Sequence, residues 1–152
     1  MSFIVNDQKL LQFTKKVFQS FGVNERNAYI CADNLVTADL RGIPSHGVAR
    51  LQRYVDGMKT GIILPLNKPK IVKEFASNAT VDGNAGLGQV VAHFSTRLAI
   101  EKAHKTGVGI VAVRNSNHYG IAGYYAEMIL KENMLGLSLT NSAPLVVPTF
   151  GK

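Results

Sequence analysis

The chain has 152 residues, of which 46% are hydrophobic, 18% charged and 8% aromatic, and it contains 14 glycines and 5 prolines. This balance is typical of one globular domain with a real core, and it excludes disordered, collagen-like and low-complexity proteins. The net charge is +7, but no run of basic residues is longer than two, which argues against a nucleic-acid-binding protein and favours a basic cleft for an anionic ligand.

Residues 1–60 are predicted to form a helical segment, because apolar side chains recur three and four positions apart. Each expected helix begins at a residue that can cap it and is followed by a glycine that can end it. With these flanking residues included, the three expected helices span 6–22, 24–42 and 45–61. Ser45 is the expected N-cap of the third helix.

Residues 61–152 are predicted to form an α/β segment, which opens with a proline-bearing connection (GIILPLNKPK, 61–70). The expected elements, in chain order, are strands over 71–75 and 79–82, a helix over 89–106, a strand over 109–114, a helix over 121–133 and a strand over 135–140. The apolar run at 109–114 is expected to be a buried strand, and with the next helix and strand it predicts a βαβ unit. The fold class is therefore α/β, with a mixed or parallel sheet.

No helix is expected after residue 140 to cover the outer face of the last strand, as a doubly wound sheet requires. This pattern indicates that the chain is the first part of a longer protein and that its α/β domain is incomplete. The glycine-rich loop GxxGxG at 83–88 precedes a helix, but it reverses the dinucleotide-binding fingerprint GxGxxG, and Arg114 stands where that fingerprint requires an acid. We interpret the loop as a turn.

The segment RGIPSHGVAR (41–50) carries the densest group of reactive side chains. If the third helix begins at Ser45, then His46, Arg50 and Tyr54 share one face, because they lie four positions apart. Imidazole can exchange a proton near neutral pH, and guanidinium can bind a carboxylate through two hydrogen bonds. This group is a candidate catalytic site. The alternative is a capped surface helix whose Arg50 pairs with an acidic residue.

Two further polar segments each follow a predicted strand. NSNHYG (115–120) contains His118, and TNS (140–142) follows the next strand along the chain. Ligands of open α/β sheets bind at the carboxyl ends of strands, so we expect both segments to face one crevice. The alternatives are a surface histidine in the first segment and an ordinary polar turn in the second.

The remaining features argue against several classes of site. The four histidines lack the spacing of a zinc-binding motif, and the single cysteine, Cys31, is expected to be a core residue, so no metal site is predicted. No segment is long and apolar enough to span a membrane, and the first residues lack the pattern of a secretory signal. We therefore expect a cytoplasmic protein without a membrane partner.

Four segments carry motifs in a distinctive order and spacing. They are RGIPSHGVARLQRYVDGMKTG (41–61), VDGNAGLGQ (81–89), VGIVAVRNSNHYGIAGYYA (108–126) and GLSLTNSAPLVVPTFGK (136–152). Together they resemble the type-2 malate/L-lactate dehydrogenase family, which includes sulfolactate and ureidoglycolate dehydrogenases, diketogulonate reductase and piperideine-carboxylate reductase. The resemblance covers essentially the whole chain but only the N-terminal half of the family's length, so we expect the chain alone to be inactive.

The resemblance implies an oxidoreductase that transfers hydride between NAD or NADP and a small 2-hydroxy or 2-oxo acid, such as malate, lactate or sulfolactate. It implies a family-specific, non-Rossmann fold for the cofactor, and a homodimer with sites near the subunit boundary. A cyclic ketimine or diketo-sugar-acid reductase is the alternative within the family. A non-catalytic interaction or nucleic-acid-binding module is the alternative from another class.

The resemblance also implies residue roles. Ser45 and His46 match a pair that donates or relays a proton in the reductase members. Arg50 matches the residue that binds the substrate, and Tyr54 is expected to line the same site. His118 matches the acid/base histidine of the hydroxy-acid dehydrogenase members, so the sequence leaves open which histidine moves the proton. The expected cofactor-binding residues are His118, Thr140, Asn141 and Ser142, of which Ser142 matches a cofactor contact of the family.

Overall fold

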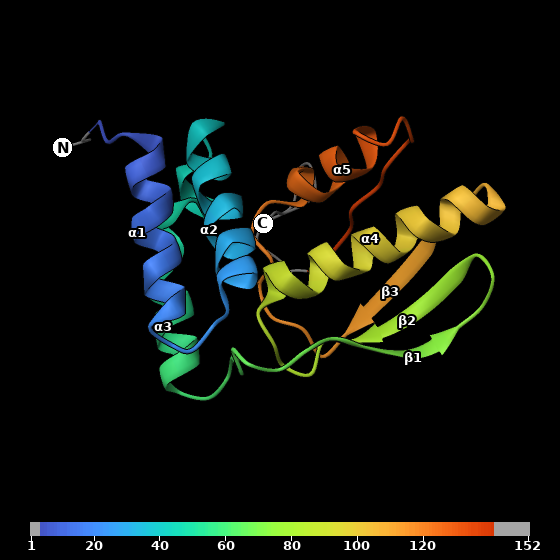
Figure 1. Ribbon diagram of the computed structural model, residues 1–152, viewed down its shortest axis with the longest axis horizontal. Helices are drawn as coiled ribbons and strands as arrows, with labels where there is room; N and C mark the ends of the chain where they lie inside the picture. Colours follow the sequence, from blue (N-terminus) through green and yellow to red (C-terminus); the bar gives the residue numbers. More distant parts are fainter. Residues whose placement is uncertain (1–3, 142–152) are drawn as a thin grey trace, which may run out of the picture.

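The computed structural model describes residues 4–141 and divides them into a helical part and an α/β part (Figure 1). The helical part contains α1 (Asp7–Gln19), α2 (Glu25–Leu40), two short 3₁₀ helices, η1 (Pro44–His46) and η2 (Val48–Arg50), and α3 (Leu51–Lys59). The α/β part contains β1 (Lys70–Glu74), β2 (Asn78–Asp82), α4 (Gly88–Thr106), β3 (Ile110–Arg114) and α5 (Ala122–Leu130). In Figure 1, α4 lies between the sheet and α5.

The first two helices begin where the sequence predicts. The side chain of Asn6 accepts a hydrogen bond from the backbone N–H of Lys9, and that of Asn24 accepts one from Asn27, each at 3.0 Å. Each bond satisfies one of the amides that the first turn of a helix leaves unpaired. The predicted helices over 6–22 and 24–42 are therefore confirmed, with α1 and α2 occupying their central residues.

The helical part encloses an apolar core. Phe18, Leu35 and Tyr54 are almost completely buried in it, and the rings of Phe18 and Tyr54 lie 6.0 Å apart. Burial of a side chain of this size contributes about 1.5–3 kcal/mol. Cys31 is also fully buried in this core, as predicted, and burial raises the pKa of its thiol far above the usual range.

The third helix begins later than predicted. Residues 44–50 form η1 and η2, and α3 starts at Leu51 rather than after Ser45. The segment is bound to α2 instead: Asp39 Oδ2 accepts a 2.8 Å hydrogen bond from the N–H of Val48, and a β-carbon on Gly47 would lie 1.9 Å from Asp39 Oδ1. This close contact favours two tight turns over a continuous helix, so Ser45 is not the N-cap of the third helix.

The sheet has the strand order β1-β2-β3, with β1 and β2 antiparallel and β2 and β3 parallel. The parallel pair is joined by α4, which packs on β2 and β3 through the apolar cluster Ala79, Val81, Val91 and Leu98. The prediction of a partly parallel sheet is confirmed. The predicted βαβ unit over 109–140 is wrong, because residues 135–140 form no strand and the unit that exists is β2-α4-β3.

Two further expectations about the α/β part need correction. Four of the five residues of β3 are exposed, although its apolar run predicts a buried strand, because α4 covers only one side of this edge strand within residues 4–141. The segment after α5 is extended, and Leu135, Leu137 and Leu139 are each at least 86% exposed. The alternation predicts a strand, but an extended segment becomes a strand only where another strand pairs with it.

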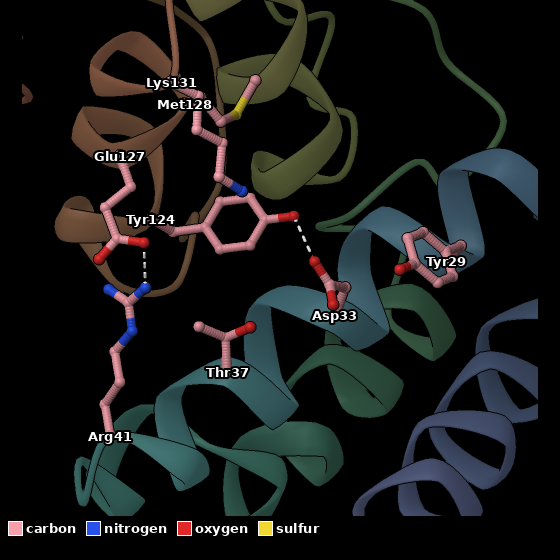
Figure 2. Close-up of a pocket in the computed structure, with 8 residues that line it drawn as sticks. All are labelled: Tyr29, Asp33, Thr37, Arg41, Tyr124, Glu127, Met128 and Lys131. Atoms are coloured by element: carbon pink, nitrogen blue, oxygen red, sulfur yellow. Dashed lines mark hydrogen bonds and ion pairs between the residues drawn. The ribbon is translucent and has the colours of Figure 1, made fainter.

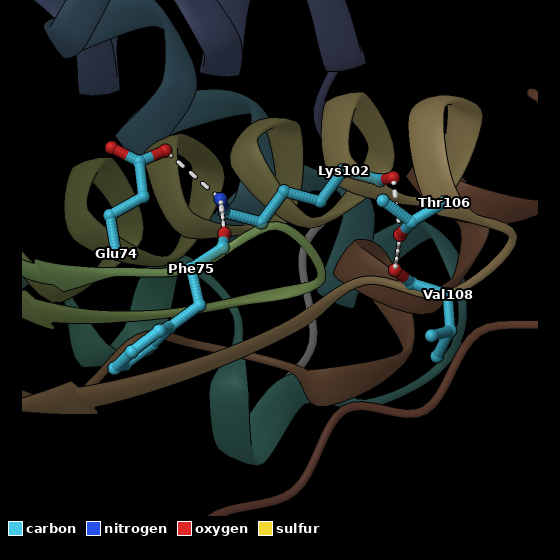
Figure 3. A network of polar contacts seen from close by, with 5 residues as sticks. All are labelled: Glu74, Phe75, Lys102, Thr106 and Val108. Carbon is cyan, nitrogen blue, oxygen red and sulfur yellow. Dashed lines mark hydrogen bonds and ion pairs between the residues drawn. The ribbon is translucent and has the colours of Figure 1, made fainter.

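A buried lysine fastens α4 to the end of β1 (Figure 3). Lys102 Nζ donates to Glu74 Oε1 at 2.9 Å and to the carbonyl oxygen of Phe75 at 2.6 Å. One turn later, the Thr106 hydroxyl donates to the carbonyl oxygens of Lys102 and Val108. These bonds hold the carboxyl end of α4 against the β1–β2 hairpin. No helix among the described residues has the length and hydropathy needed to cross a membrane.

Candidate functional site

The structure brings together the two histidines that the sequence places in separate segments. His46 lies in η1 and His118 in the loop between β3 and α5, and their rings stack with centroids 5.4 Å apart and 28° between the planes. Tyr54, from the first turns of α3, reaches the same place, with its hydroxyl oxygen 2.7 Å from His118 Nδ1. The site therefore forms where the helical part meets the α/β part.

Ser45 and Arg50 lie beside this group in an arrangement that differs from the one expected. The Ser45 hydroxyl lies 3.1 Å from His46 Nδ1, so it can orient the imidazole. Arg50 Nε donates to the carbonyl oxygen of Ser45 at 2.5 Å, which folds the side chain back over η1. His46, Arg50 and Tyr54 do not share one helix face, because α3 begins only after Arg50.

The glycine-rich loop at 83–88 supports the loop that carries His118. Asn117 Nδ2 donates to the carbonyl oxygens of Ala85 and Gly86, each at 2.9 Å. A β-carbon on Gly88 would lie 2.2 Å from the carbonyl oxygens of both Asn117 and His118. The space above this loop is therefore filled by protein backbone, which supports its interpretation as a turn rather than a phosphate-binding cradle.

Asp82, at the end of β2, ties the same two loops together. Its carboxylate accepts hydrogen bonds from the N–H of Asn84, the side-chain amide of Asn115 and Arg114 Nε, at 2.8 to 3.0 Å. These bonds stabilise the charged carboxylate and lower its pKa, with the Asn84 N–H as the largest cause. Arg114, which departs from the dinucleotide fingerprint, thus has a structural partner in this chain.

The far side of the His118 loop packs on α2. Gly120 has a φ of +83°, and a β-carbon there would lie 1.7 Å from Asn34 Oδ1. Both the backbone conformation and the lack of space therefore exclude a larger residue. Tyr125 donates a 2.5 Å hydrogen bond to the carbonyl oxygen of Tyr119 and stacks on its ring at 5.1 Å. These contacts fix the backbone on both sides of His118.

The site is electrostatically unusual. The pKa of His118 is lowered to about 4, first by burial and then by electrostatic repulsion from the neighbouring Arg53, Arg50 and His46. Burial raises the pKa of the Tyr54 phenol well above its ordinary value, although Arg50 and Arg53 act in the opposite direction. His118 is therefore neutral, and Tyr54 protonated, throughout the physiological pH range.

Two residues of the site were missed by sequence reasoning. Arg53 acts on the pKa of His118 more strongly than Arg50 does, and its position three residues after Arg50 is a signal that could have been used. Gln89 is fully buried in the first turn of α4, and its carboxamide has no hydrogen-bond partner within residues 4–141. A polar residue directly after the glycine-rich loop was the available signal for Gln89.

The third segment predicted to form part of the site, 140–142, is not packed against the histidines in its described residues. Thr140 and Asn141 are exposed, and within the described chain no hydrogen bond joins their side chains to either histidine. Ser138, two residues before Thr140, approaches the His118 loop through a 3.4 Å contact between its hydroxyl and that of Tyr119. Ser142 lies outside the described residues. Within residues 4–141, the 115–120 segment therefore meets the 44–50 segment, rather than sharing a crevice with Thr140 and Asn141 as expected.

A polar cleft of about 320 Å³ opens between α2 and α5 (Figure 2), and neither His46 nor His118 is among the residues that line it. Two interactions cross it: Tyr124 donates to Asp33 Oδ2 at 2.6 Å, and Arg41 forms an ion pair with Glu127. Because α5 follows the His118 loop directly, these contacts help to hold that loop against the helical part.

Among residues 4–141 there is no group of three or more His, Cys, Asp and Glu side chains that could hold a metal ion.

Comparison with known proteins identifies relatives of the whole chain. A family model described as malate/L-lactate dehydrogenase matches residues 5–152. A malate dehydrogenase of Pyrococcus abyssi is 58% identical over 94% of this chain and 40% of its own length. A malate/(S)-sulfolactate dehydrogenase of Methanothermus fervidus is 46% identical over 98% of this chain and 44% of its own length.

The fold is shared as well. The structure of malate dehydrogenase from Pyrococcus horikoshii superposes with a TM-score of 0.93 at 54% identity, covering 98% of this chain and 43% of that one. The chain thus spans about two fifths of the length of the relatives that it matches. Because the family model matches almost every residue, the resemblance carried by the four motifs is confirmed, and the chain belongs to the malate/L-lactate dehydrogenase family.

Proposed function

We propose that this chain contributes the proton-exchanging and carboxylate-binding groups of an NAD(P)-dependent oxidoreductase that interconverts a small 2-hydroxy acid and its 2-oxo acid. The observation that supports this most directly is the stack of His46 and His118 beside Tyr54 and two arginines. Relatives named malate and malate/(S)-sulfolactate dehydrogenase suggest a substrate of the malate or sulfolactate type.

The reaction needs a proton at the substrate oxygen when hydride reaches the carbonyl carbon. His46 is the candidate donor, because Ser45 lies at its Nδ1 and leaves Nε2 for the substrate. The positive charges of Arg50 and Arg53 stand beside the histidine pair and suit the carboxylate that every 2-oxo acid carries. In the reverse direction, the same imidazole accepts the hydroxyl proton.

The cofactor supplies or accepts the hydride when it is bound. The described residues fit such a group at one edge of the site: Thr140 and Asn141 are exposed, polar and on an extended segment that contacts the His118 loop through Ser138 and Tyr119. The glycine-rich loop does not fit the phosphates, because the backbone around Asn117 occupies the space above it. We therefore propose that Thr140, Asn141, Ser142 and His118 bind the nicotinamide end of the cofactor. The glycine-rich loop then only supports the loop that carries His118.

The finer expectations belong to the same proposal. We propose a homodimer with the site near the subunit boundary, as the family resemblance implies, and we propose that it acts in the cytoplasm. The exposed apolar side chains of Leu135, Leu137 and Leu139 support further packing of this segment in the assembled protein. Sedimentation of the whole protein tests the dimer, and a monomer of full activity would contradict it.

The decisive experiment follows the absorbance of reduced nicotinamide with the whole protein, either NADH or NADPH, and a panel of substrates. Oxaloacetate, pyruvate and a sulfonated 2-oxo acid are expected to be reduced. Activity confined to cyclic ketimines or diketo-sugar acids would replace the hydroxy-acid assignment by the alternative within the family. Salt-dependent binding of DNA or RNA without any nicotinamide binding would instead favour a non-catalytic module.

A further inference from the structure

The hydrogen bonds at His118 determine which of its ring nitrogens carries a proton. Nδ1 is 3.3 Å from the backbone N–H of Gly120 and 2.7 Å from the hydroxyl of Tyr54. A backbone N–H can only donate, so Nδ1 accepts, and the Tyr54 hydroxyl must then donate to the same atom. A neutral imidazole whose Nδ1 accepts carries its hydrogen on Nε2.

The charges around the ring favour the same state. The groups that face His118 are Arg53, Arg50, His46 and Tyr54, and the two arginines and His46 all disfavour an imidazolium there. Burial acts in the same direction as these charges, and it is the largest cause of the low pKa of His118. Burial also keeps Tyr54 protonated, and therefore able to donate, by raising the pKa of its phenol.

Gln89 is a neighbour of Tyr54. Its fully buried carboxamide has no hydrogen-bond partner among the described residues, yet it is close enough to Tyr54 to lower the pKa of the phenol. A phenol oxygen can accept one hydrogen bond while its own hydrogen is donated elsewhere. The amide hydrogens of Gln89 can therefore supply the Tyr54 oxygen while Tyr54 donates to His118.

We propose that Tyr54 and Gly120 lock His118 as the neutral ring with its hydrogen on Nε2, with Gln89 as a positioning residue for Tyr54. In this state His118 offers the ligand a hydrogen-bond donor and has no free lone pair with which to take a hydroxyl proton. The proton that the substrate oxygen gains or loses is then exchanged by His46 alone, while His118 keeps its hydrogen. The assignment of proton exchange to His46 rests on the proposed function, whereas the position of the hydrogen on His118 does not.

Nitrogen-15 NMR of the histidine side chains in the whole protein, without substrate or cofactor, tests the lock near pH 7. The His118 resonances, assigned by their loss in His118→Gln, are expected to show a protonated Nε2 and an unprotonated Nδ1. Tyr54→Phe removes the stronger donor, so both neutral forms should become populated and the pKa of His118 should rise by about one unit. Gln89→Leu should produce a smaller change in the same direction.

The matched control is Tyr119→Phe, because Tyr119 adjoins His118 in the loop but its hydroxyl contacts Ser138 instead. It should leave the Nε2-protonated form unchanged. A protonated Nδ1 in the unmodified protein would overturn the proposal, and so would a Tyr54→Phe variant that keeps a single form. An unaltered spectrum in Gln89→Leu would remove Gln89 from it. Because the spectra need no turnover, a failed substrate assay would overturn the proposed function and leave this result intact.

Discussion

The helical part and the α/β part of this chain are stabilised by different kinds of interaction. In the helical part, side chains such as Phe18, Leu35 and Cys31 are completely enclosed by neighbouring helices. In the α/β part, β1 and four of the five residues of β3 are exposed, and the leucines after α5 face outward. The first part is held by a closed core and the second mainly by one helix, α4, and by polar contacts. The candidate site lies where the two meet.

The largest expected effect comes from removing the histidine that the helical part contributes. His46→Asn should lower kcat by about 10²- to 10⁴-fold, because a positioned general acid or base contributes this much. Stability should change little, since the ring is only partly buried. Turnover and urea unfolding of the whole protein measure the two quantities. His104→Asn, at an exposed position beside Glu132, is the control, and an equal loss there would remove His46 from the mechanism.

The contrast between the two parts can be tested directly with two leucines. Leu35→Ala opens a cavity in the closed helical core and should cost about 2–5 kcal/mol of unfolding free energy. Leu137→Ala removes the same atoms from a side chain that is 87% exposed, and should change the free energy by no more than about 0.5 kcal/mol. Chemical denaturation of both variants gives the comparison. Similar losses would show that the segment after α5 is packed as tightly as the core.

The contact between the parts depends on a glycine. Gly120→Ala should cost about 3 kcal/mol, because the β-carbon would both strain a positive φ and overlap Asn34. Gly107→Ala has almost the same φ, +81°, but the new β-carbon would meet no described atom within 4 Å, so only about 1 kcal/mol should be lost. Thermal unfolding of both variants measures the two losses, and the difference between them is the cost of the overlap with Asn34. Equal losses would contradict the close approach of the His118 loop to α2.

Removing the hydrogen bonds of Lys102, which hold α4 to the end of β1, should have a smaller effect on the free energy of unfolding. Lys102→Met keeps the length of the side chain but removes the bonds to Glu74 and to the Phe75 carbonyl, and should cost about 2 kcal/mol. Glu74 is half exposed, so water can replace its lost partner and limit the cost. Lys105→Met, at an exposed position on the same helix, is the matched control for unfolding in urea. An unchanged Lys102→Met variant would show that α4 is held by its apolar face alone.

The sequence predicts the two parts with different success for a physical reason. The caps at Asn6 and Asn24 and the apolar periodicity act within one or two helical turns, so α1 and α2 follow from local pattern. The start of α3 was missed because the Asp39–Val48 bond, nine residues apart, shapes residues 44–50. Whether β3 is buried depends on what packs against it, and whether 135–140 becomes a strand depends on a pairing partner; neither is encoded locally.

In the candidate site, too, local sequence patterns predict some features, and contacts between distant segments determine the others. The motifs single out His46, His118 and Tyr54 as candidate residues, but that all three lie together depends on the packing of two distant segments. Gln89 was missed because a glutamine at the start of a helix is ordinarily exposed, and only its complete burial near Tyr54 distinguishes it. The hydrogen position on His118 could not be predicted at all, because it follows from two hydrogen bonds that only the folded chain provides.

The smallest expected effect is on the pH dependence of stability. Folded His118 binds a proton only below about pH 4, whereas an unperturbed histidine does so below about 6.5. Between these values the unfolded chain binds more protons, so stability is fully present above pH 6.5 and falls as the pH drops toward 4. The ring is only partly buried, so screening reduces the expected loss to about 1 kcal/mol.

Urea unfolding at pH 7, 5.5 and 4.5 measures this slope in the whole protein. His118→Gln should remove the part that belongs to His118, while His93, whose pKa is also lowered by burial and by Arg26 and Arg97, retains its own contribution of the same sign. The difference between the two proteins therefore isolates the ring at the junction of the helical and α/β parts. Identical slopes would mean that His118 is solvated as an ordinary surface histidine, and the close packing of the two parts around it would have to be abandoned.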